Sequence, residues 1–304
     1  MEKIVDRSGM RLDRYLVSLF PHHSRSLLQK AIGNGWVSVD GAFRPPAFRL
    51  RSGSRVTIQW PDQEPGEMDD FKKMVLYEDR DLLVLNKPPG LLVHPKGDSW
   101  LKHSEAALHD SDRTLVGLLL QKYPGLLAGN VPRCGLVHRL DRGTSGVMVI
   151  AKTAKAHRIL SEQFQERLVE KVYRVLVHGR PGSSKTEEIN LPIGRRRHHR
   201  RLEILSSGRA AQTLYRLVGT RGTVSLLEVH PLTGRTHQIR VHLHSIGCPV
   251  VGDGLYGRKA LKGQEEAMRP MLHACRLGFI HPTRGKRVRF SSPVPPDFKS
   301  VWNR

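Results

Sequence analysis

The segment from Cys134 to Lys152 reads CGLVHRLDRGTSGVMVIAK and sets one carboxylate between two arginines. Asp141 is that carboxylate, and Arg139 and Arg142 flank it. Apolar runs at 135–137 and 147–151 enclose the polar part, whose glycines, threonine and serine favour a turn. The pattern predicts a loop held by two buried strands, a common setting for a reactive side chain. The residues alone also fit a second interpretation, in which Asp141 only forms ion pairs with its neighbours.

Apolar strands dominate the chain beyond residue 74. Strands are expected at 82–86, 91–94, 146–151, 172–177, 211–218, 224–229, 277–280 and 288–290. Helices are expected at 114–123, 154–168 and 236–246, the last with Thr236 as its cap and Gly247 as its stop. Many strands with few covering helices predict an α+β domain around a mixed or antiparallel sheet.

The first 61 residues predict a small separate domain. Leu12, Tyr15, Leu16 and Leu19 keep helical spacing, a second apolar helix face follows at 27–32, and short strands are expected at 36–39 and 55–60. The helices would expose basic residues, namely Arg11, Arg14, Arg25 and Lys30. Residues 62–73 are polar and acidic and predict a mobile linker. Residues 74–304 then form the main domain.

Charge and cysteine usage limit the class of protein. Fifty Lys and Arg against 28 Asp and Glu give a formal charge of +22, which indicates a polyanionic partner. Nucleic acid is the first candidate; an anionic membrane is less favoured, because no long amphipathic helix with a bulky apolar face is evident. Three scattered cysteines argue against a disulfide framework or a zinc site. A polar N-terminus and the lack of a long apolar run predict a soluble, cytoplasmic protein.

Four blocks in a fixed order carry a family resemblance. They are 81–95 (DLLVLNKPPGLLVHP), 138–146 (HRLDRGTSG), 171–179 (KVYRVLVHG) and 232–243 (LTGRTHQIRVHL), the last followed by PVVGDGLY at 249–256. From about residue 70 to its C-terminus the chain resembles the RluA-type pseudouridine synthases, of the RluC or RluD kind. RLDRYL, SRSLLQKAI and the later V-x-V-D-G resemble an S4 RNA-binding domain, with a generic helical hairpin as the alternative.

The resemblance implies the pseudouridine synthase fold and an isomerase that converts uridine to pseudouridine within structured RNA. Large-subunit ribosomal RNA, or the assembling large subunit, is the expected partner, without membrane or DNA. It also implies a monomer that needs no metal, nucleotide or redox cofactor. The rival interpretation is a non-catalytic RNA-binding factor of ribosome assembly that keeps the fold.

The resemblance also assigns residues. Asp141 would be the catalytic carboxylate, and Arg240 its cationic partner, since a buried carboxylate without one resists ionisation; Arg235 is the alternative partner. Tyr173 would stack on the target base, whereas a strand tyrosine ordinarily packs in the sheet. Arg139 would fill the space left by the extruded nucleotide.

The remaining polar residues support more than one interpretation. Arg142 fits a phosphate contact, and His138 fits a structural or RNA-contacting role better than that of a general base. The run 195–201, which includes Arg195, Arg196 and Arg197, is either a solvated loop or a phosphate-binding one. The Lys87-Pro88-Pro89-Gly90 turn is expected to shape the edge of the active site. Four histidines could suggest a metal site, but only two carboxylates, Glu228 and Asp253, lie close to them in sequence, so a metal is not favoured; the histidines are His230, His237, His242 and His244.

Overall fold

The computed structural model describes residues 2–20, 25–59, 66–97, 99–102, 107, 113–126, 131–196, 199, 201–257 and 267–303, without the side chains of 25–27, 30, 66–69, 99 and 102. The chain divides into two compact units, Met1–Lys73 with Leu92–Cys134, and Met74–Leu91 with Gly135–Arg304. The first division, between residues 73 and 74, falls where the predicted linker ends. Residues 92–134 group with the N-terminal part, which the sequence does not predict.

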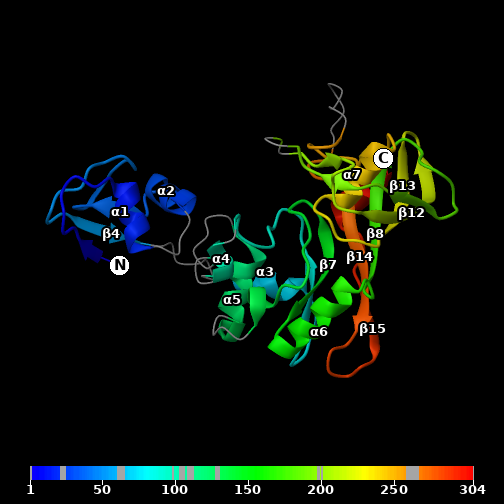
Figure 1. Cartoon of the computed structure of the whole chain (residues 1–304), viewed down its shortest axis with the longest axis horizontal. Coiled ribbons are helices and arrows are strands. Elements are labelled where there is room, and N and C mark those ends of the chain that lie inside the picture. The colour runs from blue at the N-terminus through cyan, green and yellow to red at the C-terminus, as the bar shows by residue number, and fades with distance from the viewer. Residues whose placement is uncertain are drawn as a thin grey trace. The chain divides into compact units, whose positions relative to one another are not determined.

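The N-terminal part of the first unit is a small sheet covered by two helices (Figure 1). Its antiparallel strands run in the order β1 (Glu2–Ile4), β4 (Arg55–Ile58), β2 (Val37–Val39) and β3 (Ala42–Phe43). Helices α1 (Leu12–Leu19) and α2 (Arg25–Gly33) contribute Leu12, Leu16 and Leu28 to a buried core with Val56. Both predicted helices are present. The chain reverses between β2 and β3 through Asp40 and Gly41, both with positive φ, as a tight hairpin requires.

A helix, α3 (Gly66–Met74), occupies most of the segment predicted to be a mobile linker. This helix was not predicted from the sequence, and residues 62–65 lie outside the described residues. Phe71 explains the difference, because its side chain is buried and its ring meets that of Tyr123 edge-on, with the ring centroids 6.3 Å apart. The predicted domain boundaries themselves stay a prediction.

The expected strand at 91–94 is absent from the described structure. Leu92 forms only an isolated bridge with Thr114. The carbonyl groups of Leu92 and Val93 instead accept hydrogen bonds from the backbone N–H groups of Leu115 and Val116. These donors open α5 (Leu115–Lys122), where an α-helix has no internal acceptor for them. The carbonyl groups of this apolar run therefore accept hydrogen bonds from the first turn of α5. The short helix α4 (Ser99–Lys102) lies between the two segments in the sequence.

Among the described residues of the second unit, nine strands form one sheet. The order is β5-β6-β7-β14-β8-β13-β12-β9, with β15 also paired to β14. Only β7 and β14 pair in parallel, so the sheet is mixed, as predicted. The strand bounds are Val75–Glu78 (β5), Leu82–Lys87 (β6), Ser145–Ala151 (β7), Glu170–His178 (β8), Glu187–Asn190 (β9), Gln212–Arg221 (β12), Val224–Pro231 (β13), Leu272–Ile280 (β14) and Arg287–Ser291 (β15).

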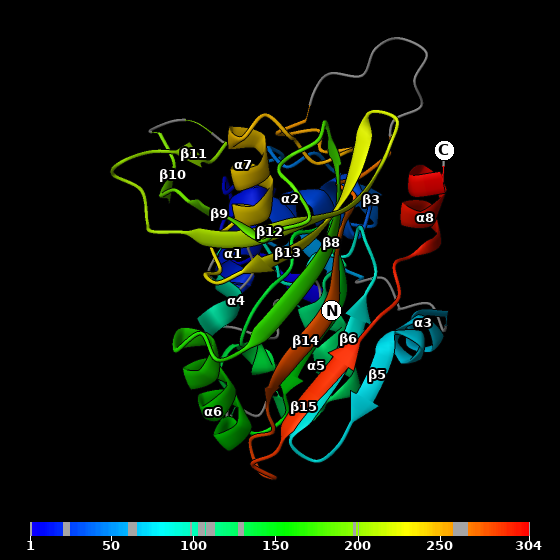
Figure 2. The ribbon, with the colours of Figure 1, turned by 90° about the vertical axis from the view of Figure 1, so that its right-hand side faces the viewer.

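The centre of this sheet is apolar on both faces. Every residue of β7 is buried, which matches its continuous apolar sequence. Gly146 has a φ of +122°, and a Cβ there would collide with the backbone of Ala274, so only glycine allows β7 to approach β14 so closely. Helix α6 (Ala154–Gln165) lies against this part of the sheet in Figure 2 and buries Leu160.

Two local predictions around the loop of Asp141 are wrong. The segment before it is not a strand, since Gly135 ends a 3-10 turn (Pro132–Gly135) and Leu136 makes only an isolated bridge to Ile150. Helix α7 (Gln238–Ser245) starts two residues later than predicted. His237 precedes it with a φ of +55°, so Thr236 does not cap the helix. Helix α8 (Pro296–Asn303) follows the last strand. None of the helices described is long and apolar enough to span a membrane.

Candidate active site

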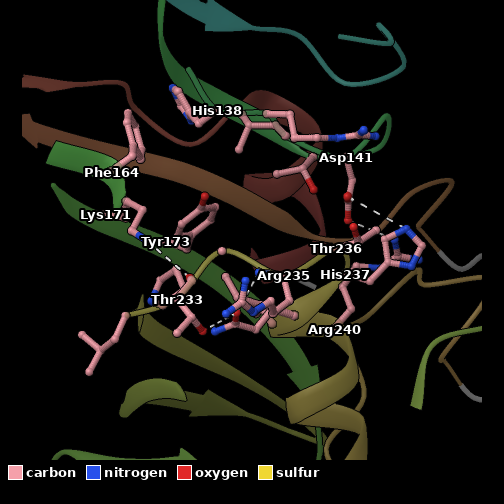
Figure 3. Close-up of a pocket in the computed structure, with 18 of the residues that line it drawn as sticks. His138, Asp141, Phe164, Lys171, Tyr173, Thr233, Arg235, Thr236, His237 and Arg240 are labelled. Atoms are coloured by element: carbon pink, nitrogen blue, oxygen red, sulfur yellow. Dashed lines mark hydrogen bonds and ion pairs between the residues drawn. The ribbon is translucent and has the colours of Figure 1, made fainter. Parts of the chain in front are cut away.

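A cavity of about 510 Å³ opens beside the loop of Asp141. Its walls come from that loop, from β8, from the end of α6 and from residues 231–240 (Figure 3). Asp141, Tyr173 and Arg240 all line it, although they are far apart in the sequence. The fold thus brings together the three residues that sequence reasoning placed at the centre of the site.

Arg240 is the cation that faces Asp141. Its Nη1 donates to Asp141 Oδ2 over 3.1 Å, and the two side chains are 9% and 20% exposed. Arg235, the alternative partner, donates instead from Nε to the carbonyl of Ala210 at 3.0 Å. The geometry favours the first of the two predicted pairings.

A second carboxylate, Asp253, holds Arg240 from the other side, a pairing that the sequence did not predict. Arg240 donates from Nε to Asp253 Oδ2 at 2.7 Å and from Nη2 to Oδ1 at 2.8 Å. Asp253 is fully buried and also accepts the backbone N–H groups of Leu255 and Tyr256. Burial would lower the pKa of Arg240, but the two carboxylates raise it above its usual value. The only signal was the Asp in PVVGDGLY, whose spacing does not reveal a partner.

Lys87 holds the loop of Asp141 in place. This side chain is fully buried, and its Nζ donates to the carbonyls of Pro88 at 2.8 Å, Leu91 at 2.9 Å and Arg142 at 3.4 Å. Burial lowers the pKa of Lys87 to about 7. Arg142 donates from Nε to the carbonyl of Gly90, which returns a backbone hydrogen bond. The turn at 87–90 therefore supports the loop, and one donor of Arg142 is engaged within the protein.

Tyr173 stands in the middle of β8 with its half-buried ring on the cavity side. Burial raises the pKa of Tyr173, and the charge of Asp141 raises it further. The phenol is therefore neutral at physiological pH, which suits a stacking surface better than a base.

Two histidines that line the pocket have lowered pKa values. His138 accepts the backbone N–H of Val149 on Nε2 at 3.0 Å and stacks on Phe164, and burial lowers its pKa to about 3. It has the structural contacts that the sequence favoured. Burial also lowers the pKa of His237, whose Nε2 lies 3.9 Å from Asp141 Oδ1. Sequence reasoning considered His237 only as a metal ligand. In the described part of the chain, no three His, Cys, Asp or Glu residues are grouped to hold a metal.

The segment that leads into α7 is fixed by Gln238. Its Oε1 accepts the hydroxyl of Thr233 at 2.6 Å and the N–H of Arg235 at 2.9 Å. Its Nε2 donates to Gln212 and Thr213 of β12. Gln238 thereby ties the pocket wall at 233–237 to the sheet. The H-Q-I-R block contained this residue, but nothing in the sequence indicated its contacts.

The other residues predicted to bind RNA lie in several places. Arg139 is exposed and lines the cavity, and Arg14 is exposed on α1. Arg195 and Arg196 are exposed between β10 (Ile193–Gly194) and β11 (Glu203–Ile204), where Arg196 pairs with Glu203. Three of the predicted contacts lie outside the described residues or side chains, namely Arg25, Lys30 and Arg197.

Fold and pocket together define a protein with a small cavity that holds an Arg–Asp ion pair beside a tyrosine. The sequence profile of the RNA pseudouridylate synthase family matches residues 81–245, which is more than half of the chain and contains Asp141, Tyr173 and Arg240. The chain belongs to the RNA pseudouridine synthase family. It is accordingly an isomerase that acts on RNA.

Relatives match over nearly the full length. The chain is 40% identical to the ribosomal large subunit pseudouridine synthase D of Zymomonas mobilis, over 97% of this chain and 93% of the relative. It is 42% identical to an uncharacterized RNA pseudouridine synthase of Chloroflexus aurantiacus, over 97% of this chain and 90% of the relative. The solved structure of human RNA pseudouridylate synthase domain containing 1 matches with a TM-score of 0.56 and 29% identity, over 76% of this chain and 86% of that one. The fold is thus that of a pseudouridine synthase.

Proposed function

We propose that this chain converts specific uridines of large-subunit ribosomal RNA to pseudouridine, with Asp141 as the reacting carboxylate. The observation that carries the proposal is the placement of Asp141 in the cavity, ion-paired to Arg240 and close to Tyr173. The names of relatives such as the Zymomonas mobilis synthase D support the choice of large-subunit RNA and a synthase D-like subtype.

The reaction exchanges one glycosidic bond for another. The bond between C1′ and N1 of uridine breaks, the uracil rotates, and a bond forms between C1′ and C5. The proton on C5 is lost and N1 gains one, so the product is an isomer and the balance requires no oxidant, reductant or co-substrate. The carboxylate of Asp141 can contribute by attack on the sugar, by attack on the base, or by assisting the loss of a sugar proton.

Arg240 supports each of these uses of Asp141. Its guanidinium lies 3.1 Å from the carboxylate and forms an ion pair with it inside the cavity. Asp253 fixes the guanidinium through two further hydrogen bonds, so the position of the charge is set before substrate arrives. Tyr173 offers a neutral ring on which an extruded uracil can stack. Arg139, exposed beside Asp141, would take the place of that nucleotide in the RNA.

The N-terminal sheet and its two helices are proposed to act as an S4-type RNA-binding domain. Support comes from the helix pair packed on a small sheet and from the exposed Arg14 on α1. Arg25 and Lys30, which the sequence also predicts to contact RNA, lie on α2. Contacts of this kind bring affinity rather than sequence specificity, because they are made to phosphate groups.

Mapping pseudouridine in cells tests the proposal. Ribosomal RNA and transfer RNA from cells without the gene are compared at nucleotide resolution with RNA from the parent strain and from a complemented strain. The expected result is the loss of one or more pseudouridines from large-subunit ribosomal RNA and their return on complementation. Loss confined to transfer RNA would contradict the proposed substrate. No loss in either RNA would favour the non-catalytic assembly factor.

A further inference from the structure

One wall of the cavity carries three cations that the proposed reaction does not use. Lys171, Arg167 and Arg235 line the same cavity as Asp141. Lys171 and Tyr173 are two residues apart on β8, so their side chains leave the same face of the strand about 7 Å apart. Figure 3 shows Lys171 beside Thr233, on the other side of Tyr173 from Asp141 and Arg240. The cations thus extend the site beyond the space for the target base.

Lys171 and Arg235 have neutral carbonyl oxygens as partners. Lys171 Nζ lies 3.4 Å from the carbonyl oxygen of Thr233, and Arg235 Nε donates to that of Ala210. Within the described residues, none of the three cations forms an ion pair with a carboxylate, whereas Arg240 a few residues away has two. Burial, followed by the charge of Arg167, lowers the pKa of Lys171 to about 8. Like charges held together without a counter-charge favour the binding of an anion.

The backbone supports this placement of Arg167. It follows the end of α6 with a φ of +62°, a left-handed conformation that residues other than glycine rarely adopt. Its backbone N–H donates to the carbonyl of Phe164, which also lines the cavity. The turn between α6 and β8 therefore holds an arginine at the cavity wall, four residues before Lys171.

We propose that Lys171, Arg167 and Arg235 form a subsite for the phosphodiester group next to the target uridine. The inference rests on the proposed function, because it assumes that a uridine of an RNA chain enters the cavity. With the base on Tyr173 and the ribose at Asp141, the RNA backbone continues along the cavity wall. A phosphate there meets one ammonium and two guanidinium groups, the latter suited to two parallel hydrogen bonds.

Chemically altered RNA tests the subsite. The probe is a single-stranded pentanucleotide with a central uridine, in which the phosphate on its 5′ or its 3′ side is replaced by a neutral methylphosphonate. Affinities are measured by fluorescence anisotropy for the full chain, for Lys171→Met and Arg235→Gln, and for Lys155→Met. Lys155 is the matched control, since it is exposed near the start of α6 and loses the same charge about 15 Å along the helix from the pocket.

The wild-type protein is expected to lose about tenfold in affinity when one of the two linkages is neutral, as the loss of a charge-assisted hydrogen bond predicts. Lys171→Met should bind the unmodified RNA about tenfold more weakly and be indifferent to that linkage, whereas Lys155→Met should behave like the wild type. Arg235→Gln should reduce the discrimination even if Lys171→Met fails to fold.

Wild-type affinity that ignores both linkages would overturn the subsite. The subsite would also be overturned if the variants bind the RNA less well but still discriminate fully between charged and neutral linkages. Lys171 would then contact the base or only stabilise the fold. The measurement reports binding alone. A wild-type protein that discriminates between the linkages but forms no pseudouridine would refute the proposed function and leave the subsite intact.

Discussion

Replacing Asp253 by asparagine tests whether the position of Arg240 matters for the reaction. Asp253 Oδ1 accepts hydrogen bonds from Arg240 Nη2 and from the N–H groups of Leu255 and Tyr256, while Oδ2 accepts Arg240 Nε. An amide oxygen can replace Oδ1 and keep three of these bonds. The amide NH₂ group then faces the N–H at Nε, where donor meets donor across 2.7 Å. Arg240 must move away from the place where it meets Asp141.

The cost of this change follows from burial. Removing one partner of a buried ion pair costs about 3–5 kcal/mol, and the lower end applies because Arg240 keeps Asp141. A loss of about 3 kcal/mol lowers the Tm of a domain of this size by about 6–12 °C. A displacement of about 1 Å in a catalytic constellation lowers the rate by about a hundredfold. We expect a reduction of this order in the single-turnover rate, with RNA affinity nearly unchanged.

The assay measures single-turnover formation of pseudouridine in a ribosomal RNA fragment at saturating protein, alongside RNA affinity and urea unfolding. Glu228→Gln is the matched control. Glu228 lies on β13 with 9% of its side chain exposed. It forms ion pairs with Arg216 of β12 and Arg174 of β8 and lies outside the cavity. It should lose stability without losing rate at saturation. If Asp253→Asn shows the same pattern as Glu228→Gln, Asp253 only stabilises the fold and the argument is refuted.

Three further predictions concern charge and domain organisation. Arg240→Met removes the cation that pairs with Asp141, so the single-turnover rate should fall while RNA affinity stays nearly unchanged; an unchanged rate would argue against a role of this pair in the reaction. The pKa of Lys87 falls from 10.5 to about 7 on folding, so the unfolded state binds more protons between these values and wild-type stability gains from Lys87 as pH rises. Urea unfolding from pH 6.5 to 10 should show this gain in the wild type relative to Lys87→Met, and parallel curves would contradict it. Removing residues 1–61 should weaken binding to folded ribosomal RNA and flatten its salt dependence, while a short substrate is still isomerised at saturation; unchanged affinity and slope would refute the tethering role.

The fold was predictable where periodicity was long enough to be visible. The continuous apolar run of β7 and the helical spacing of α6 predicted those elements. Strands β1 and β3, with three and two residues, are too short to show a period. The helix at 66–74 was missed because its many polar and acidic residues are typical of a linker. The burial of Phe71, which stabilises the helix, is not visible in the composition. The apolar residues at 91–94 look like a strand in sequence, and only α5 shows where their carbonyls bind.

The site was predictable in its residues but not in its connections. The family resemblance placed Arg240 beside Asp141 across 99 residues of sequence. The contact of Asp253 with Arg240 was not predicted, because an acidic residue 13 positions after an arginine carries no indication of contact. Lys87 was assigned to a turn, but its three carbonyl acceptors depend on how β6 meets the loop of Asp141. Such contacts are set by tertiary packing, which spacing does not encode.

The most direct test of the central claim is the single-turnover rate of Asp141→Asn. Asparagine keeps the shape, and Arg240 keeps its two hydrogen bonds to Asp253, so the fold should persist. The substitution removes the negative charge that the reaction requires. On a labelled ribosomal RNA fragment we predict RNA binding close to that of the wild type and no detectable pseudouridine, with Glu228→Gln as the active control. Formation of pseudouridine by Asp141→Asn at the wild-type rate would contradict the assignment of Asp141 as the reacting carboxylate.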